Sequence, residues 1–231
     1  MNQEPDPRQR YQNHGAALLQ GLFAPEIVAA ISYQLSEQVA RTGTAMLAPP
    51  SLGDKPCYEA YGYALPVLAT FLWGLTPQIE TLTGCRLLPT YCYFRTYQQG
   101  DVCRVHTDRP ACEHSLSLTL GYADGIAWAL SVSERPLAPD AALRQTRHGE
   151  ADFGAITHVD LPMQPGDAVL YRGVDHAHGR LLPNPNRWSA HLFMHWVDRN
   201  GPYADRAFDR QQVGGLADFV FPSNPEQAVF T

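Results

Sequence analysis

The chain has 231 residues, of which 45% are hydrophobic, and this suits one enzyme-sized domain with a substantial core. Its formal net charge is −6 and it has no long basic run, which argues against a nucleic-acid groove, because such a groove needs clustered Lys and Arg. No apolar run reaches the roughly 18 residues that a membrane span needs, so we expect no membrane association.

The first residues and the cysteines bear on the compartment. Met1–Asp6 lacks the basic-then-apolar pattern of a signal peptide. The cysteines are odd in number, contain no C-x-x-C pair and have spacings that fit no zinc site. We therefore expect a cytoplasmic protein with reduced thiols. The five cysteines are Cys57, Cys85, Cys92, Cys103 and Cys112.

The N-terminal third predicts two helices. Residues 1–13 are polar, and we expect them to lack fixed structure. A helix follows over Ala24–Thr42, where apolar residues recur at helical spacing. Ala48–Pro66 is rich in Pro, Gly and Tyr and predicts a loop. Val67–Thr83 predicts a second helix, which Gly84 ends.

From Leu87 onward the hydrophobic period changes to that of strands. Ser115–Leu120 alternates strictly, so its leucines face one side of a sheet and its small hydroxyl residues the other. The hydroxyl face suits either a cofactor cavity or an edge strand open to solvent. Residues 127–133 continue the sheet, and the charged, Pro-rich segment 134–151 predicts a loop or a lid.

The next segment predicts two strands with a histidine pair between them. Pro165–Asp167 is a turn signal, and the apolar strand after it leads to His176 and His178. Pro183–Asn186 makes another turn. Arg187–Val197 then predicts an apolar and aromatic strand.

Many short strands after two helices predict a mainly β protein of the α+β class. The specific expectation is a double-stranded β-helix, or jelly roll, with helical support on one face. We expect a single domain over residues 1–231, with helical support at about 20–84, a core at about 87–198 and a tail at 200–231. The tail ends in apolar residues, so we expect it to fold back on the barrel or to meet a second subunit in a possible homodimer.

Three residues predict a metal site. His106-Thr-Asp108 and His178 supply two imidazoles and one carboxylate, the ligand set of the facial triad that holds iron(II) and leaves positions open. His176 is the alternative to His178 as second histidine. An H-x-D triplet or a lone histidine is weak by itself, and the strand–ligand–turn–strand order gives the pattern its force.

An arginine beyond the histidines predicts a carboxylate anchor, because guanidinium matches carboxylate geometry in a bidentate way. Arg187 is our choice, with Ser189 and Tyr97 as hydrogen-bond partners, although Tyr97 is also compatible with a core position. Arg172 and Arg180 compete for this role. Arg172 lies too close before the ligand, and Arg180 is expected in the turn, where it would contact substrate.

These motifs resemble the 2-oxoglutarate/Fe(II)-dependent oxygenase superfamily, in particular its prolyl-hydroxylase-like members. The run Tyr91–Tyr97, a glycine turn and then His106-Thr-Asp108 is similar to the segment before their first ligand. Arg187-x-Ser189 matches the R-x-S motif of related oxidases in the superfamily, and the nine-residue gap from His178 to Arg187 matches the spacing of the superfamily. Phe23–Val28 resembles their opening helix. The resemblance covers residues 20–198.

The resemblance implies a hydroxylase that uses Fe(2+), O2 and 2-oxoglutarate and releases succinate and CO2, with ascorbate as a possible reductant. It implies His106, Asp108 and His178 as metal ligands, and Arg187, Ser189 and Tyr97 as the cosubstrate site. Halogenating relatives have a small residue in place of Asp108, so this carboxylate favours hydroxylation. The substrate is expected to be a small molecule, an amino acid or a peptide side chain.

Two other readings stay open. One is a cupin-type metal enzyme that does not use 2-oxoglutarate, and the Arg187-x-Ser189 pair argues against it. The other is an inactive jelly-roll binding module, and the complete ligand set argues against that. The expected substrate contacts are the loop 134–151 together with Tyr58, Tyr61, Tyr63, Arg109 and Trp128.

Overall fold

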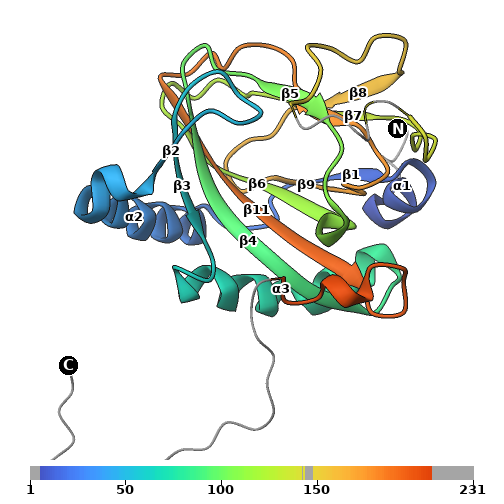
Figure 1. Cartoon of the computed structure of the whole chain (residues 1–231). Coiled ribbons are helices and arrows are strands. Elements are labelled where there is room, and N and C mark those ends of the chain that lie inside the picture. The colour runs from blue at the N-terminus through green and yellow to red at the C-terminus, as the bar shows by residue number, and fades with distance from the viewer. Residues whose placement is uncertain (1–5, 142, 144–147, 210–231) are drawn as a thin grey trace, which may run out of the picture.

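Two antiparallel sheets face each other in the computed structural model, which describes residues 6–141, 143 and 148–209 (Figure 1). The larger sheet has the strand order β1-β9-β6-β11-β4-β3-β2, and the smaller has the order β5-β10-β7-β8. This arrangement is the predicted double-stranded β-helix. The strands are β1 (Ala16–Leu19), β2 (Leu47–Ala48), β3 (Cys57–Tyr61), β4 (Leu87–Gln98), β5 (Cys103–His106), β6 (His114–Tyr122), β7 (Leu130–Ser133), β8 (His158–Leu161), β9 (Ala168–Tyr171), β10 (His178–Arg180) and β11 (Trp188–Asp198).

The main hydrophobic core lies between the larger sheet and two long helices, α2 (Pro25–Thr42) and α3 (Pro66–Thr83). Both helices begin within one residue of the predicted position, each with proline in the first turn, where its missing N–H costs no hydrogen bond. Leu72 and Ile79 of α3 belong to the same buried cluster as Leu116 and Leu118 of β6. The leucine face of β6 therefore packs on the helices.

The hydroxyl face of the same strand points between the two sheets. Ser115, Ser117 and Thr119 are fully buried, so the solvent-edge reading of this strand is excluded. Small side chains at these positions leave room between the sheets for larger groups from β4, β10 and β11. The central strands thus separate a helix-covered core from a polar interior.

Two segments differ from the sequence-based expectation. Pro7–His14, expected to lack structure, forms helix α1, which Asp6 caps through a 3.1 Å bond from the Arg8 amide. Its Tyr11 is buried, and the helix packs on β1 and α3. The predicted loop 48–66 contains β3, which pairs with β4 and extends the larger sheet.

Other expectations concern covalent links and the remaining segments. All five cysteines are free thiols, as predicted. Among the described helices, none is long and apolar enough to cross a membrane. The described part of segment 134–157 connects β7 to β8 by loops. The expectation that the apolar end of the tail folds back or meets a second subunit concerns residues 210–231, which lie outside the described residues.

Candidate metal centre

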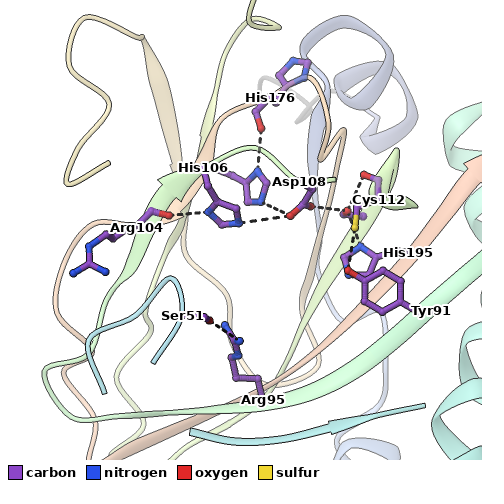
Figure 2. A network of polar contacts seen from close by, with 11 residues as sticks. Ser51, Tyr91, Arg95, Arg104, His106, Asp108, Cys112, His176 and His195 are labelled. Carbon is purple, nitrogen blue, oxygen red and sulfur yellow. Dashed lines mark hydrogen bonds and ion pairs between the residues drawn. The ribbon is translucent and has the colours of Figure 1, made fainter. Parts of the chain in front are cut away.

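The structure brings His106, Asp108 and His178 together between the sheets. His106 ends β5, His178 begins β10, and the two are direct partners in the antiparallel register. Asp108 follows in the loop after β5, where its amide donates to the Gly173 carbonyl at 2.8 Å. One carboxylate oxygen, Oδ1, lies 3.6 Å from Nε2 of His106 and 3.5 Å from Nε2 of His178 (Figure 2).

The backbone fixes which nitrogen each histidine presents. Nδ1 of His106 lies 2.7 Å from the Arg104 carbonyl, and Nδ1 of His178 lies 2.9 Å from the His176 carbonyl. A carbonyl only accepts, so each Nδ1 donates and each Nε2 keeps its lone pair. Both lone pairs are on the nitrogens nearest Asp108, and the three ligand atoms lie within 4.8 Å of one another. Such a set can hold one metal ion.

The electrostatics favour an ionised carboxylate. Burial alone would raise the pKa of Asp108, but the two histidines outweigh it and hold that pKa well below its usual value. Burial lowers the pKa of His106, and His178 lowers it further. Burial also acts to lower the pKa of His178, but the Asp108 charge raises it overall. Asp108 therefore carries a negative charge into the site, as a metal ligand must.

The second oxygen of Asp108 is held from the larger sheet. Ser115 Oγ lies 3.1 Å from Asp108 Oδ2 and 2.8 Å from Nδ1 of His195 on β11. Burial lowers the pKa of His195 to about 4, so its ring is neutral near pH 7. Gly173 closes over the same oxygen, since a Cβ there would stand 2.3 Å from Oδ2. The carboxylate is enclosed on that side.

A narrow inner cavity adjoins the three ligands, and Arg180 lines it. Arg180 lies on β10 with 1% exposure, so its predicted place in the turn was wrong. Its guanidinium lies over the Trp128 ring at 4.8 Å and donates to the Trp128 carbonyl. No ion pair with a carboxylate is formed by Arg180 among the described residues. A buried guanidinium of this kind is costly unless an anion joins it.

His191 and Tyr97 lie beside Arg180. Arg180 Nη2 is 3.4 Å from Nδ1 of His191, and the guanidinium can only donate, so Nε2 of His191 carries the proton. That Nε2 is buried and has no partner among the described residues. Tyr97 lines the inner cavity and meets the Trp128 ring edge-on at 5.1 Å. The region around Arg180 therefore has more hydrogen-bond donors than acceptors.

Arg95, also on the cavity wall, differs from Arg180 because it is already neutralised. Its Nε lies 2.7 Å from Glu59 Oε2, and its Nη2 lies 2.5 Å from the same oxygen. Its Nη2 also donates to Ser51 (Figure 2). Arg95 has its counter-charge within the protein, whereas Arg180 has none in the described part of the chain.

The structure does not bring Arg187 to this cavity. Its side chain is 71% exposed, and its Nε lies 3.0 Å from Asp124 Oδ1. The Arg187 amide also donates to Asp124, at 2.7 Å, so this carboxylate holds the residue on the outside of the turn before β11. Ser189 is buried nearby, but its hydroxyl accepts from Asn184 Nδ2 at 3.2 Å. Of the three predicted anchor residues, Tyr97 alone lines the cavity.

The alternative residues of the motif lie elsewhere. The His176 ring packs against Gly15, and Figure 2 shows it pointing away from Asp108 while its carbonyl points toward the ligands. Arg172 lies over the Tyr11 ring at 5.6 Å. Neither residue reaches the metal centre.

A second, more open cavity of 460 Å³ meets the metal centre at Asp108. It is lined by Thr107, Asp108, Pro110, Pro139, Val174, Asp175 and Tyr203. This volume suits a small molecule or a side chain. We call it the outer cavity, and we call the one that contains Arg180 the inner cavity.

The predicted substrate contacts separate into groups. Arg109 lies over the Tyr91 ring at 4.3 Å and forms a two-bond pair with Asp209, at 2.7 and 3.0 Å. Tyr61 and Tyr63 stack at 5.1 Å, and Tyr61 continues onto Tyr93 at 5.4 Å. Trp128 is buried beneath Arg180. Tyr58 instead lines a groove between α2 and the outer face of the larger sheet.

Sequence reasoning missed Ser115 and His195 as members of the site and misplaced Arg180. Arg180 stands two residues after His178, so in a strand both side chains share one face, and this signal was present in the sequence. For Ser115 and His195 the signal was the alternation of β6 and β11, which indicates a polar face but not what it touches.

Neither a family model nor a curated protein sequence matches this chain. Solved structures do match. The non-haem, α-ketoglutarate-dependent carbocyclase SnoK from nogalamycin biosynthesis has a TM-score of 0.66 at 13% identity over 85% of each chain. HygX from Streptomyces hygroscopicus, with nickel and 2-oxoglutarate bound, has a TM-score of 0.60 at 11% identity over 85% of this chain and 88% of that one.

A prolyl-4-hydroxylase from Pseudomonas putida has a TM-score of 0.53 at 18% identity, over 82% of this chain and 96% of that one. At these low sequence identities, the comparisons show a shared fold and no more. This chain therefore has the double-stranded β-helix of those oxygenases, over nearly their full length. Its function depends on the residues of its own site.

Proposed function

We propose that this chain is a 2-oxoglutarate-dependent, non-haem iron(II) oxygenase that hydroxylates a small molecule, an amino acid or a peptide side chain. The observation that carries the proposal is one cavity that joins a two-histidine, one-carboxylate set to a buried arginine without a counter-charge. The structural likeness to oxygenases of this class supports it.

The residues fit iron(II). His106 and His178 each present an unprotonated Nε2, and Asp108 presents a charged oxygen between them. Three protein ligands on one face are the pattern of non-haem iron(II) oxygenases. Bound iron(II) and 2-oxoglutarate supply the oxidising chemistry, in which 2-oxoglutarate and O2 give succinate, CO2 and a hydroxylated product. The protein orients the ligands and keeps water out of the inner cavity.

Arg180 is the residue that we assign to the distal carboxylate of 2-oxoglutarate, in place of Arg187. Its buried guanidinium has no carboxylate partner in the described chain and lines the same cavity as the ligands. Tyr97 and the protonated Nε2 of His191 stand beside it as further donors. Arg187 is already paired with Asp124 and faces solvent.

The outer cavity is the place that we assign to the substrate. It meets the metal centre at Asp108 and holds a molecule of modest size. Because Asp108 supplies a carboxylate at the position that halogenating relatives leave open, we expect oxygen rather than chlorine to be added to the substrate.

The test of the metal is succinate formation from 2-oxoglutarate with Fe(II) and ascorbate. We expect it in the wild type and not in His106→Ala, Asp108→Ala or His178→Ala, because each removes one metal ligand. His176→Ala, whose ring points away, should keep part of the activity. If the wild type binds iron but makes no succinate, with or without a candidate substrate, the chain is better explained as a cupin-type metal enzyme that does not use 2-oxoglutarate.

The test of the anchor is the apparent affinity for 2-oxoglutarate. Arg180→Leu should weaken it by roughly 30-fold or more, since losing one partner of a buried charged pair costs about 2–5 kcal/mol. Arg187→Ala is the matched control and should change it little. The opposite ranking of the two variants would return the anchor to Arg187.

A further inference from the structure

Asp108 uses its two oxygens differently. Oδ1 lies between the two histidine Nε2 atoms, at 3.6 and 3.5 Å. Oδ2 lies 3.1 Å from the Ser115 hydroxyl, on the side of the larger sheet. A carboxylate oxygen that already accepts a hydrogen bond is a poorer metal ligand than a free one, so the direction of this bond matters.

The contacts of Ser115 settle that direction. Its Oγ lies 3.1 Å from Asp108 Oδ2, 3.2 Å from the Cys112 carbonyl and 2.8 Å from Nδ1 of His195. Both oxygens only accept, so they compete for the single Ser115 proton, and the ionised carboxylate, which is also slightly nearer, is the stronger acceptor. If Ser115 donated this proton to His195, neither Asp108 Oδ2 nor the Cys112 carbonyl would receive a hydrogen bond, and both oxygens would face a lone pair of Ser115 Oγ. Nδ1 of His195 must therefore be the donor to Ser115.

The pair is built into two neighbouring strands. His195 on β11 and Ser115 on β6 are direct cross-strand partners. The His195 ring is 2% exposed and packs on Tyr91, with ring centres 4.5 Å apart. The donor is thus fixed by the sheet register and by packing, not by a mobile surface side chain.

We propose that His195 and Ser115 are positioning residues that hold Oδ2 of Asp108, so that the carboxylate offers only Oδ1 to the metal. The relay runs from His195 Nδ1–H to Ser115 Oγ, and from the Ser115 hydroxyl to Asp108 Oδ2. A carboxylate that offers one oxygen leaves a coordination position that a two-oxygen carboxylate would occupy. The inference rests on the metal centre of the proposed function and adds two residues to it.

The first measurement is Mn(II) affinity, which needs no substrate. Ser115→Ala should weaken Mn(II) binding by about 10- to 100-fold, as is typical when the partner of a metal ligand is lost, because the carboxylate is no longer held in place and binding of its second oxygen does not compensate for this. Ser117→Ala is the matched control, because Ser117 lies on the same strand and face, is equally buried and has a hydroxyl with no hydrogen-bond partner among the described residues. That control should bind Mn(II) as the wild type does.

The second pair of variants tests the donor on His195. His195→Asn keeps an N–H near the Nδ1 position and should retain affinity within a few-fold, whereas His195→Leu should lose it as Ser115→Ala does. Nitrogen-15 NMR of the wild type should show the neutral His195 ring protonated on Nδ1. A ring protonated on Nε2 would overturn the relay.

The third measurement is the visible spectrum of the Co(II)-substituted protein. Release of Oδ2 in Ser115→Ala should raise the coordination number and weaken the cobalt absorption bands, while Ser117→Ala should leave them unchanged. If both Ser115→Ala and His195→Leu keep the wild-type affinity and spectrum, the positioning roles are overturned, but the metal centre is not. A wild type that binds neither Mn(II) nor Co(II) would overturn the metal centre, and the inference with it.

Discussion

Gly173 leaves just enough space for the Asp108 carboxylate. A Cβ at this position would lie 2.3 Å from Asp108 Oδ2 and 2.7 Å from Ser115 Oγ. We predict that Gly173→Ala displaces the carboxylate and weakens Mn(II) binding more than about tenfold, because a close-packed interior cannot absorb the methyl group. Gly74→Ala is the control, since a Cβ there meets nothing within 4 Å. Wild-type Mn(II) affinity in Gly173→Ala would contradict this account.

The grouping of His106, Asp108 and His178 was predictable at this scale, and the position of Arg187 outside the inner cavity was not. Metal chemistry restricts ligands to a few residue types, so His106, Asp108 and His178 were recognisable by type and order. Whether Arg187 turns inward depends on Asp124, which lies 63 residues away in the chain. No local pattern reports such a distant partner, and for this reason the sequence did not show that Arg180, and not Arg187, lines the inner cavity.

Helix α3 contains one glycine in its interior and one at its end, and we predict opposite effects of alanine at the two. Gly74 is exposed and unobstructed, so Gly74→Ala should raise the free energy of unfolding by about 0.5–1 kcal/mol. Gly84 ends the helix with φ of +78°, a left-handed conformation that alanine resists, so Gly84→Ala should lower it by about 1 kcal/mol. Urea unfolding of both variants measures these two changes in the free energy of unfolding, and changes of the same sign would refute the prediction.

The long elements were predictable because their apolar spacing extends over several turns or pleats. Helices α2 and α3 and strand β11 lie close to their expected bounds, and β4 begins at Leu87, where the strand period was expected to start. Helix α1 and strand β3 were not predicted, because each is short and depends on distant contacts. Tyr11 of α1 bonds His114 of β6 at 2.5 Å, across 103 residues, and β3 exists by pairing with β4.

Buried neutral histidines should make the whole fold sensitive to acid. Burial, with help from Arg172, lowers the pKa of His114 to about 4, whereas Asp198 and Asp175 act to raise it. The unfolded chain binds this proton at about pH 6.5. The contribution of His114 to the free energy of unfolding is therefore fully present above about pH 6.5. It is lost as the pH falls toward 4, by up to about 3 kcal/mol.

Urea unfolding of the metal-free protein between pH 7 and 4 measures this loss. His114→Gln should be less stable at pH 7 but should flatten the pH dependence between 6.5 and 4. His158→Gln, which changes a partly exposed histidine, is the control and should keep the wild-type slope. An unchanged slope in His114→Gln would assign the acid sensitivity to other groups.

The architecture of the molecule was more predictable than its cavities. Alternating strands after two helices lead to a double-stranded β-helix by packing rules alone. The outer cavity, in contrast, needs Pro139, Val174 and Tyr203 to meet from three segments far apart in the chain. Such a meeting depends on loop conformations that carry no periodic signal.

The meeting of the two cavities at Asp108 implies an order of events during turnover. The two cavities share Asp108, so we expect a molecule in the open outer cavity to block the way from solvent to the narrow inner one. The cosubstrate should therefore enter before the substrate, and succinate should depart after the product. Initial-rate kinetics should show a compulsory order of binding. Excess substrate should slow turnover, because it traps succinate in the inner cavity. An enzyme that binds its two reactants in either order would have a second passage into the barrel.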